Sequence, residues 1–345
     1  MIKPVVAFLL VLGTSFHIGG GLSPCFIQHA SAPTLADTKV HGTNIPEIEL
    51  HAGTIQPLKV PPFGFSGFAM SDSRGNFFFL VGHGMDLTHA SVMRVSAHTG
   101  EAQVYVLPEE AGATVTYGVS PAGRVYMIGL DKDSHYTRVE FGLDGTTLTT
   151  TRLNLPASLV LTDFLISNSG AMVIGGYFNS SAPEKMRGKQ HVALYDNSGN
   201  ETRVLSNVGA NLDLAYLRNH LFDGATCIGS DNEIYIARAE SLRVYDMQGR
   251  LIQRGTVPKP DASYSIGKIQ QSGHFIVVWL RRPRQDAPAE LKLLLLTSST
   301  LQPFRIYYPD AALGTIAVGF DETNGFTFLK RTEKCDACFI SAPIN

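Results

Sequence analysis

The sequence predicts an all-β protein assembled from one repeated unit of short strands and tight turns. The unit is seen whole between Ser71 and Pro108, where the apolar run Phe77 to Val81 follows a turn that ends at Gly75. A second turn at Gly100 leads into another alternating run. Runs rich in β-branched and aromatic residues, bounded by Gly, Asp, Asn and Ser, are typical of strands joined by tight turns. Nothing in the unit has the periodicity of a helix.

Variants of this unit recur along most of the chain. The first turn returns at intervals of 41 to 62 residues, with its glycine or equivalent at Gly123, Gly170, Asn232, Gly273 and Gly325. The second turn returns at Gly145, Gly199 and Gly249, and in a degenerate Ser-Ser-Thr form at Thr300. A period of this length indicates a β-propeller, because a single four-stranded sheet cannot bury both faces until neighbouring sheets pack against it. Six first turns predict six blades.

The last repeat lacks its outer strand. The sixth unit begins at Gly325, so its outer strand would lie near or beyond residue 345. A substitute is found at the other end of the chain, since residues 51–61 match residues 98–108 in length and at His, Gly, Gln and the final Pro. We therefore expect Thr54 to Val60 to complete the last blade, so that the ring has no open edge.

The first residues of the chain have the composition of a secretory signal. Lys3 precedes the apolar run Val5 to Leu12, and Ala30-Ser31-Ala32 supplies the small residues of a cleavage site. The apolar run is too short to span a bilayer. A lipid anchor on Cys25 is an alternative, although Pro24 departs from the lipid-attachment motif, and a retained membrane anchor is another.

Three segments follow from these observations. We expect a signal peptide over residues 1–32, a linker over residues 33–44 and the propeller domain over residues 45–345. The mature protein would then be exported, to the periplasm or the extracellular space, with no transmembrane span.

Composition agrees with a turn-rich β domain and excludes one class of partner. The chain contains 33 Gly and 18 Pro, and only 17% of its residues are charged, against about 25% in ordinary domains. The formal net charge is −2, which gives no basic surface for binding DNA or RNA.

Cys335 and Cys338 form a close pair. Their spacing occurs in redox and metal sites, but zinc would need a second pair or histidines in register, and Phe339 excludes a c-type haem attachment. In an oxidising compartment we expect a disulfide between them. Free structural thiols and a redox-active pair are the alternatives. Cys227 falls in an inner-strand pattern and is expected to be buried.

The longest interval between units contains a helical pattern. Residues 211–221 carry leucines at 214, 217 and 221, with Asn211 available as an N-cap and Gly224 just past the end. We expect a short helix on this connection between an outer strand and the next inner strand. It would border the central channel, either as a lid or as an insertion that plugs its mouth.

The repeat assigns the loops to two faces. Connections after the second and fourth strands of each unit emerge together on what we call the loop-rich face, and the tight turns form the short-turn face. Candidate ligand-binding residues on the loop-rich face are Arg281, Arg282, Arg284, Tyr216, His220 and Asp223. The arginines could hold an anionic ligand or a glycan, with a solvated charged loop as the alternative. The short-turn face is expected to be too tight to form a pocket.

Imidazoles and carboxylates at these loops and near the channel are candidate metal ligands. The candidate set is His83, His135, His191, Asp163 and Asp223. Histidines from three consecutive blades could hold a divalent metal, although exposed loop histidines are also common without one. In the second unit His135 is accompanied by Asp131 and Asp133.

The sequence carries no G-x-S-x-G elbow, P-loop, H-E-x-x-H motif or dinucleotide fingerprint. The strand endings Tyr195-Asp-Asn-Ser-Gly199 and Tyr245-Asp-Met-Gln-Gly249 resemble those of six-bladed propellers of the NHL and TolB-like group. The resemblance spans roughly residues 45–345 and implies the fold. That group includes binders of ligands and proteins as well as metal-dependent lactonases.

We therefore expect an exported binding or interaction module that works through its loop-rich face without a cofactor. Its partner would be a protein, a small molecule or a glycan. The alternative is a lactonase-like hydrolase with a divalent metal at the central channel, because the fold alone does not fix the function.

Overall fold

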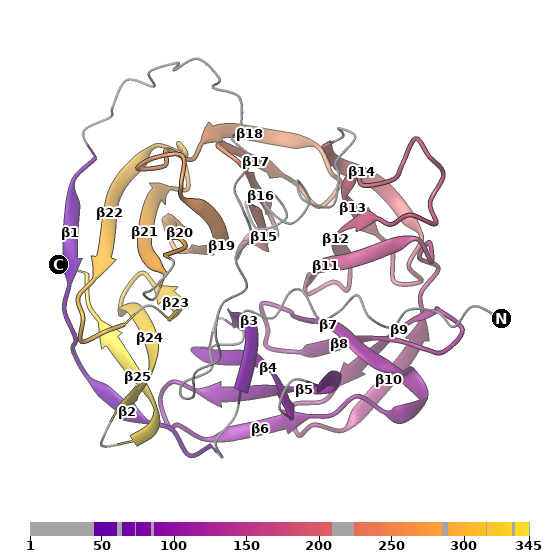
Figure 1. Cartoon of the computed structure of the whole chain (residues 1–345), viewed down its shortest axis with the longest axis horizontal. Helices are drawn as coiled ribbons and strands as arrows, with labels where there is room; N and C mark the ends of the chain where they lie inside the picture. The colour runs from indigo at the N-terminus through magenta and orange to yellow at the C-terminus, as the bar shows by residue number, and fades with distance from the viewer. Residues whose placement is uncertain are drawn as a thin grey trace, which may run out of the picture.

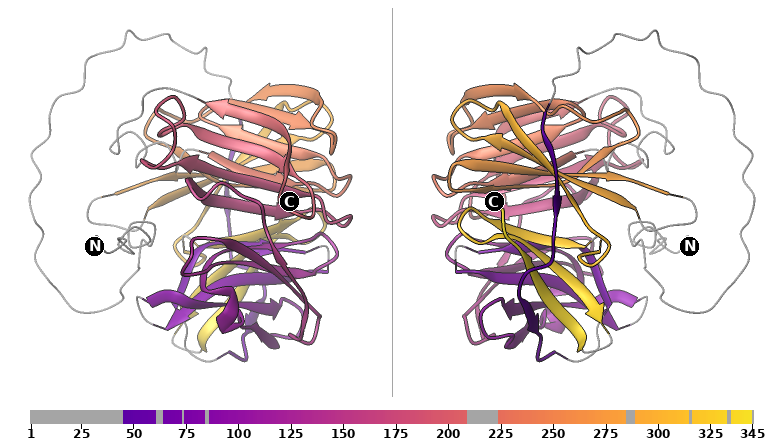
Figure 2. Two further views of the ribbon diagram at one scale, coloured as in Figure 1. Left: turned by 90° about the vertical axis from the view of Figure 1, so that its right-hand side faces the viewer. Right: turned by 90° about the vertical axis from the view of Figure 1, so that its left-hand side faces the viewer.

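The computed structural model describes residues 45–60, 64–72, 74–83, 86–208, 224–284, 289–314, 316–332 and 335–344. Within these residues the strands form six sheets that surround a central axis (Figure 1). Figure 2 shows the disc edge-on, with the blades side by side. The prediction of a six-bladed β-propeller is confirmed.

Each blade is an antiparallel sheet whose strands run in chain order from the axis to the rim. Blade one contains β3 (Gly64–Ser71), β4 (Asn76–His83), β5 (Asp86–Ser96) and β6 (Ala102–Tyr105). The 3-10 turn η2 (Glu109–Ala111) leads to blade two, which contains β7 (Ala113–Val119), β8 (Val125–Leu130), β9 (Tyr136–Phe141) and β10 (Thr147–Arg152). Blade three contains β11 (Leu159–Ile166), β12 (Met172–Phe178), β13 (Gln190–Tyr195) and β14 (Glu201–Val208).

The second half of the ring repeats the pattern. Blade four contains β15 (Gly224–Ile228), β16 (Ile234–Arg238), β17 (Ser241–Tyr245) and β18 (Leu251–Thr256). Blade five contains β19 (Ser265–Ser272), β20 (Phe275–Arg282), β21 (Glu290–Thr297) and β22 (Pro303–Pro309). Blade six contains β23 (Ala317–Asp321), β24 (Gly325–Thr332) and β25 (Cys335–Ala342). The expected helix over residues 211–221 lies outside the described residues, as do the expected signal peptide and linker.

The hydrophobic core is divided among the interfaces between blades. Buried apolar residues fall into clusters that each join two neighbouring blades, and the described residues supply such a cluster for every pair around the ring. In β4, Phe77 and Phe79 pack against blade six, whereas Phe78 packs against blade two. Side chains of a strand alternate between the two faces, so an apolar run without polar positions buries both. This is why the second strands read as continuous apolar sequence.

The N-terminal residues close the ring as predicted. β2 (Ile55–Pro57) pairs antiparallel with β25, with Ile55 opposite Ile340. Backbone hydrogen bonds extend this pairing on both sides, from the Gly53 amide to the Ser341 carbonyl and from the Leu58 amide to the Ala337 carbonyl. The strand that the repeat lacks at its C-terminal end is therefore supplied from its N-terminal end.

A second N-terminal strand was not predicted. β1 (Glu47–Leu50) adds to blade five as a fifth strand and runs parallel to β22. Leu50 is buried between blades five and six. Figure 2 shows β1 crossing the rim of the disc over the strands of these blades. Within the described residues the other five sheets have four strands each and no counterpart to β1, so the repeat gave no signal for it.

The same segment also reaches blade one. The Lys59 amide donates to the Gly100 carbonyl over 3.0 Å, and the Lys59 ammonium lies 2.6 Å from the Glu101 carboxylate. A Cβ on Gly100, whose φ is 69°, would lie 2.6 Å from the Pro57 carbonyl oxygen, so only glycine fits at this turn. We call residues 45–60 the N-terminal latch, because they hold blades five, six and one together.

Removal of the latch should open the ring. A chain that begins after residue 60 exposes the edge of β25, and we expect it to aggregate or to unfold without a cooperative transition. A chain that begins after residue 50 keeps β2 and should unfold in one transition, destabilised by about 2 kcal/mol or more through the loss of buried Leu50. Urea unfolding followed by tryptophan fluorescence measures both. If the chain that begins after residue 60 unfolds like the full chain, β2 does not close the ring.

Candidate functional site

The two faces of the disc are arranged as the repeat predicts. Asp261, in the β18–β19 connection, forms an ion pair with Arg282 at the end of β20. In blade six the Lys330 ammonium donates to the carbonyls of Ala311 and Ala312 in the β22–β23 connection. Connections after second and fourth strands therefore meet on one face. No helix within the described ranges is long and apolar enough to cross a membrane.

Two of the predicted ligand-binding arginines belong to a network at blade five on this face. Arg282 and Arg284 both form ion pairs with Glu290 at the start of β21. The Arg282 guanidinium also lies 3.4 Å from Asp261 and 5.0 Å from the centroid of the Tyr264 ring. We call Asp261, Tyr264, Arg282, Arg284 and Glu290 the blade-five cluster.

The cluster is balanced in charge and fixed in geometry. The Tyr264 hydroxyl donates to Glu290 over 2.5 Å, and this hydrogen bond, with those from Arg282 and Arg284, lowers the pKa of Glu290 to about 2 against the opposing effect of burial. Two guanidinium groups thus face two carboxylates. An anionic ligand would have to compete with Glu290 and Asp261 for them. The Arg284 side chain nevertheless remains 51% exposed, so part of its hydrogen-bonding capacity points to solvent.

The cluster is joined to the N-terminal latch. The Lys292 ammonium lies 5.9 Å from the centroid of the Tyr264 ring and donates to the Glu47 carboxylate of β1 over 2.7 Å.

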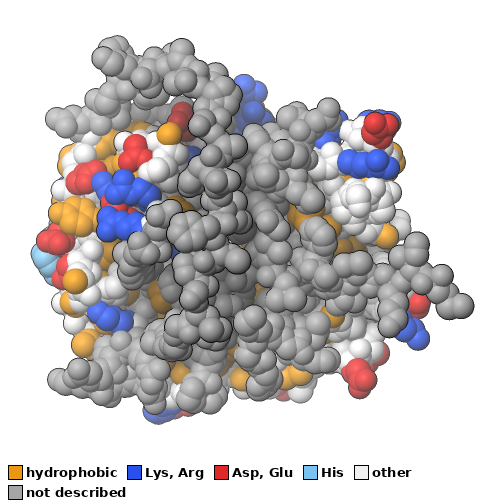
Figure 3. All heavy atoms as spheres, viewed as in Figure 1, with side chains coloured by type: hydrophobic (Ala, Val, Ile, Leu, Met, Phe, Trp, Pro, Cys, Tyr) orange, Lys and Arg blue, Asp and Glu red, His pale blue; other side chains and the backbone are white. Residues whose placement is uncertain are grey.

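The third predicted ligand-binding arginine, Arg281, lies next to the cluster, and burial lowers its pKa. Figure 3 shows basic and acidic side chains gathered side by side over blade five. The other predicted ligand-binding residues, Tyr216, His220 and Asp223, lie outside the described residues.

The predicted metal ligands that the structure describes have separate partners. His191 is buried, and its Nε2 lies 2.8 Å from Glu201 of the adjacent strand. Asp163 forms an ion pair with Arg238 over 3.2 Å. His135 lies 3.4 Å from Asp131. The side chain of His83 and the whole of Asp223 are outside the described part of the chain.

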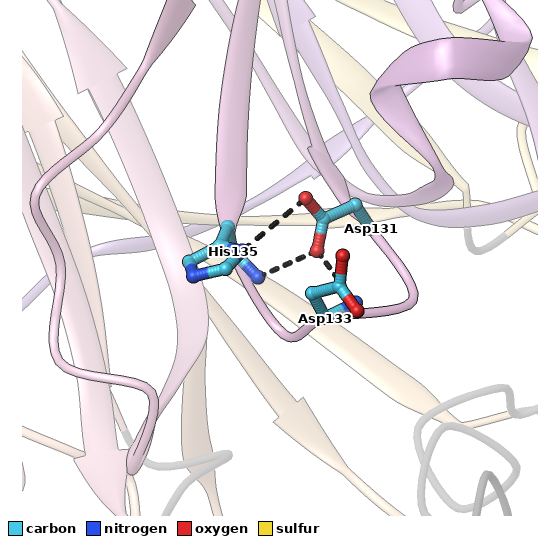
Figure 4. A group of neighbouring side chains, drawn as sticks. All are labelled: Asp131, Asp133 and His135. Carbon is cyan, nitrogen blue, oxygen red and sulfur yellow. Dashed lines mark hydrogen bonds and ion pairs between the residues drawn. The ribbon is translucent and has the colours of Figure 1, made fainter.

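Among the described residues, one group of side chains lies close enough to share a metal ion. The ligand atoms of Asp131, Asp133 and His135, in the β8–β9 turn, all fall within 4.8 Å of one another (Figure 4). Asp131 Oδ1 accepts hydrogen bonds from the amides of Asp133 and His135, and its other oxygen faces the His135 ring. The hydrogen bond from the His135 amide is the largest contribution that lowers the pKa of Asp131.

The same arrangement recurs in turns that lack histidine. Asp72, Asp196 and Asp246 each accept the amides two and four residues later on Oδ1. Their Oδ2 atoms are contacted by the side chain four residues later, which is Asn76, Asn200 or Arg250. His135 occupies the equivalent position. The group at Asp131 is therefore accounted for as an aspartate-capped turn.

Substitutions at this turn distinguish a cap from a metal site. Asp131→Ala should lower the thermal unfolding midpoint by a few degrees because two turn amides lose their acceptor, and Asp196→Ala should act similarly in blade three. His135→Asn should be nearly neutral, since asparagine fills this position in two other turns. Differential scanning calorimetry with and without zinc is the measurement. A zinc-dependent rise of the wild-type midpoint that His135→Asn abolishes would contradict the cap.

A lysine near the channel was missed by the sequence analysis. Lys268, on the inner strand β19, donates to the Val318 carbonyl of blade six over 2.7 Å and lies 4.8 Å from the centroid of the Trp279 ring. Burial lowers the pKa of Lys268 to about 7, with an opposing contribution from Cys227 of blade four. Its environment is made by three blades, so no local sequence signal marks it.

This lysine should give the protein a pH-dependent stability. An unfolded lysine has a pKa near 10.4, so between about pH 7 and pH 10 the unfolded chain binds more protons at this position than the folded chain. The contribution of Lys268 to the free energy of unfolding therefore rises with pH over that interval. Lys268→Met should remove this rise and should be more stable than the wild type at pH 7. The free energy of unfolding, measured with urea at several values between pH 7 and pH 10, tests this. The exposed control Lys132→Met should keep the wild-type slope; an unchanged slope in Lys268→Met would refute the assignment.

The cysteines are only partly described. Cys338 is buried in β25, whereas the side chain of Cys335 lies outside the described residues, so the disulfide stays a prediction. Cys227 is partly rather than fully buried on β15, and burial raises the pKa of its thiol to about 12. Its thiol is therefore protonated at neutral pH.

The expectation that the short-turn face has no pocket is wrong. A crevice of about 450 Å³ opens between blades four and five on that face. It is lined by the first turns of both blades and the second turn of blade five, including Asp231, Glu233, His274, Ser298 and Ser299. The turns themselves are tight, but those of neighbouring blades stand apart and leave space between them.

Comparisons with known proteins find similar solved structures only. No protein-family model matches the chain. No curated protein matches it either. Among solved structures, the chain is similar to a gluconolactonase from Xanthomonas campestris, at 14% identity and a TM-score of 0.46, over 85% of this chain and 99% of that one. It is similar to a luciferin-regenerating enzyme at 6% identity and a TM-score of 0.50, over 84% and 95% of the two chains.

A third similar structure is the β-propeller domain of the Trilobed protease from Pyrococcus furiosus, at 8% identity and a TM-score of 0.43, over 82% of this chain and 97% of that one. Identities this low show the fold alone. The six sheets of the structure itself confirm, at the level of fold, the resemblance to six-bladed propellers stated from the strand endings.

Proposed function

We propose that the protein is an exported binding module that contacts a protein partner through the blade-five cluster on its loop-rich face. The observation that supports this is the arrangement of Arg282 and Arg284, which share Glu290 and extend toward solvent from the end of β20. The proposed binding needs no cofactor.

Preorganised arginines suit an interface. Freezing long side chains costs free energy on binding, and this cost is lower where the side chains are already held. Here Glu290 and Asp261 fix the Arg282 guanidinium and Tyr264 packs against it. Arginine and tyrosine are also enriched among residues that dominate binding energy. Because the cluster has equal numbers of arginines and carboxylates, it fits a polar protein surface of mixed charge better than a polyanion.

Among the described residues, the predicted metal ligands give less support to the metal-centred hydrolase than the blade-five cluster gives to binding. Asp163, His135 and His191 come from the predicted metal set, and each contacts a different partner in a different part of blades two to four. A catalytic metal would need three or more of its ligands to converge on one point. The blade-five cluster, in contrast, is already assembled.

The proposal is tested by affinity capture from the native source. Arg282→Ala with Arg284→Ala should reduce the recovery of the specific partner about tenfold or more, because two exposed donors are lost from the centre of the contact. Arg152→Ala, an exposed arginine on β10, is the matched control and should recover the partner normally. Replacing Arg282 and Arg284 by lysine keeps the charge but loses the planar guanidinium group with its several N–H donors. This variant should give an intermediate recovery of the partner. Equal recovery by all variants, at unchanged unfolding midpoints, would disprove the role of the cluster.

A further inference from the structure

We propose that the crevice between blades four and five binds a small molecule carrying a primary ammonium group. This site lies on the short-turn face and is separate from the protein-binding surface proposed above. Its volume of about 450 Å³ is in the usual range for small-ligand sites.

The walls of the crevice are held by hydrogen bonds that cross between blades and turns. The Ser230 amide of blade four donates to the Gln271 side chain of blade five over 2.9 Å. The Gln253 side chain, on β18, donates to the Ser299 carbonyl over 3.0 Å. Within blade five the Ser298 amide donates to the His274 carbonyl over 2.8 Å. These bonds hold the crevice in shape, so a ligand would meet a preformed site.

Two departures from the repeat meet at this crevice. Asn232 replaces glycine in the first turn of blade four and keeps the positive φ of that position, at 59°. In blades three and four the second turn begins with an aspartate, Asp196 or Asp246, that caps the turn. In blade five this turn begins at Thr297, and the small side chains of Ser298 and Ser299 that follow it line the crevice.

The chemistry of the lining selects a cation. Asp231 and Glu233 supply carboxylates, and no lysine or arginine is among the residues that line the crevice. The Tyr235 hydroxyl donates to one oxygen of Glu233, which orients that carboxylate and leaves its second oxygen available. Asp231 and Ser299 are exposed, and among the described residues the Asp231 carboxylate and the Ser299 hydroxyl have no hydrogen-bond or ion-pair partner, so both are accessible to a ligand. A primary ammonium has three donors and no acceptor, which matches carboxylates and hydroxyls placed together.

Two sources could supply the ammonium group, an amino sugar or a linear polyamine. Both can be tested by isothermal titration of the full-length mature protein. Glucosamine and putrescine are the charged probes, and N-acetylglucosamine and 1,4-butanediol are their neutral counterparts. We expect at least one amine to bind about tenfold more tightly than its neutral counterpart, and the one that binds identifies the source.

Variants locate the binding. Asp231→Asn with Glu233→Gln should weaken amine binding about tenfold or more, because both charges are removed without a large change of shape. Glu184→Gln removes an exposed carboxylate from the opposite face and should bind as the wild type does. Ser298→Phe keeps both carboxylates but fills the crevice, and should also abolish binding.

Three results would overturn the proposal. One is equal binding of amines and neutral counterparts, and another is wild-type affinity in the double variant. The third is no binding of either amine at about 10 mM. The unfolding midpoint of each variant shows that the fold is kept. None of these results depends on Arg282 or Arg284, so failure here leaves the proposed protein-binding function standing.

Discussion

The pairing of β2 with β25 is the contact on which the rest of the propeller depends. Every blade buries its faces against two neighbours, so a gap anywhere in the ring would expose the apolar surfaces on both sides of it. The described chain meets this requirement with the N-terminal latch, which pairs with blades five and six and hydrogen-bonds to blade one. The contacts of the latch to blades five and one hold β2 in place beside β25.

A smaller contact between blades is repeated around the ring. A side chain near the start of an outer strand reaches the carbonyls of the second turn in the next blade. Gln103 does so toward Asp144, Arg203 toward Gln248 and Gln253 toward Ser299. In the latch, Gln56 lies beside Gly100 in the corresponding place. The repeat thus encodes a contact between neighbouring blades as well as the internal structure of each blade.

Features encoded within one unit could be predicted from the sequence, whereas features made between units could not. The turn glycines, the number of blades and the closing strand could be predicted from the turn residues that recur in each unit. Gly75, Gly100 and their equivalents have the positive φ that such turns require. β1 has no counterpart in the repeat, and Lys268 owes its lowered pKa to neighbours from other blades. His135 was proposed as a metal ligand. Aligning the turns with each other, rather than only the glycines, would have placed it beside Asn76 and Asn200.

The latch also fixes the order in which the protein can be completed. Ile55 and Ile340, which face each other in blade six, are 285 positions apart in the chain. During synthesis β2 leaves the ribosome long before its partner β25 is made. Contacts of such long sequence separation form slowly because the loop between them must first be closed. β2 must therefore stay unpaired while the 285 residues that lead to its partner are made, and during that interval the ring is open.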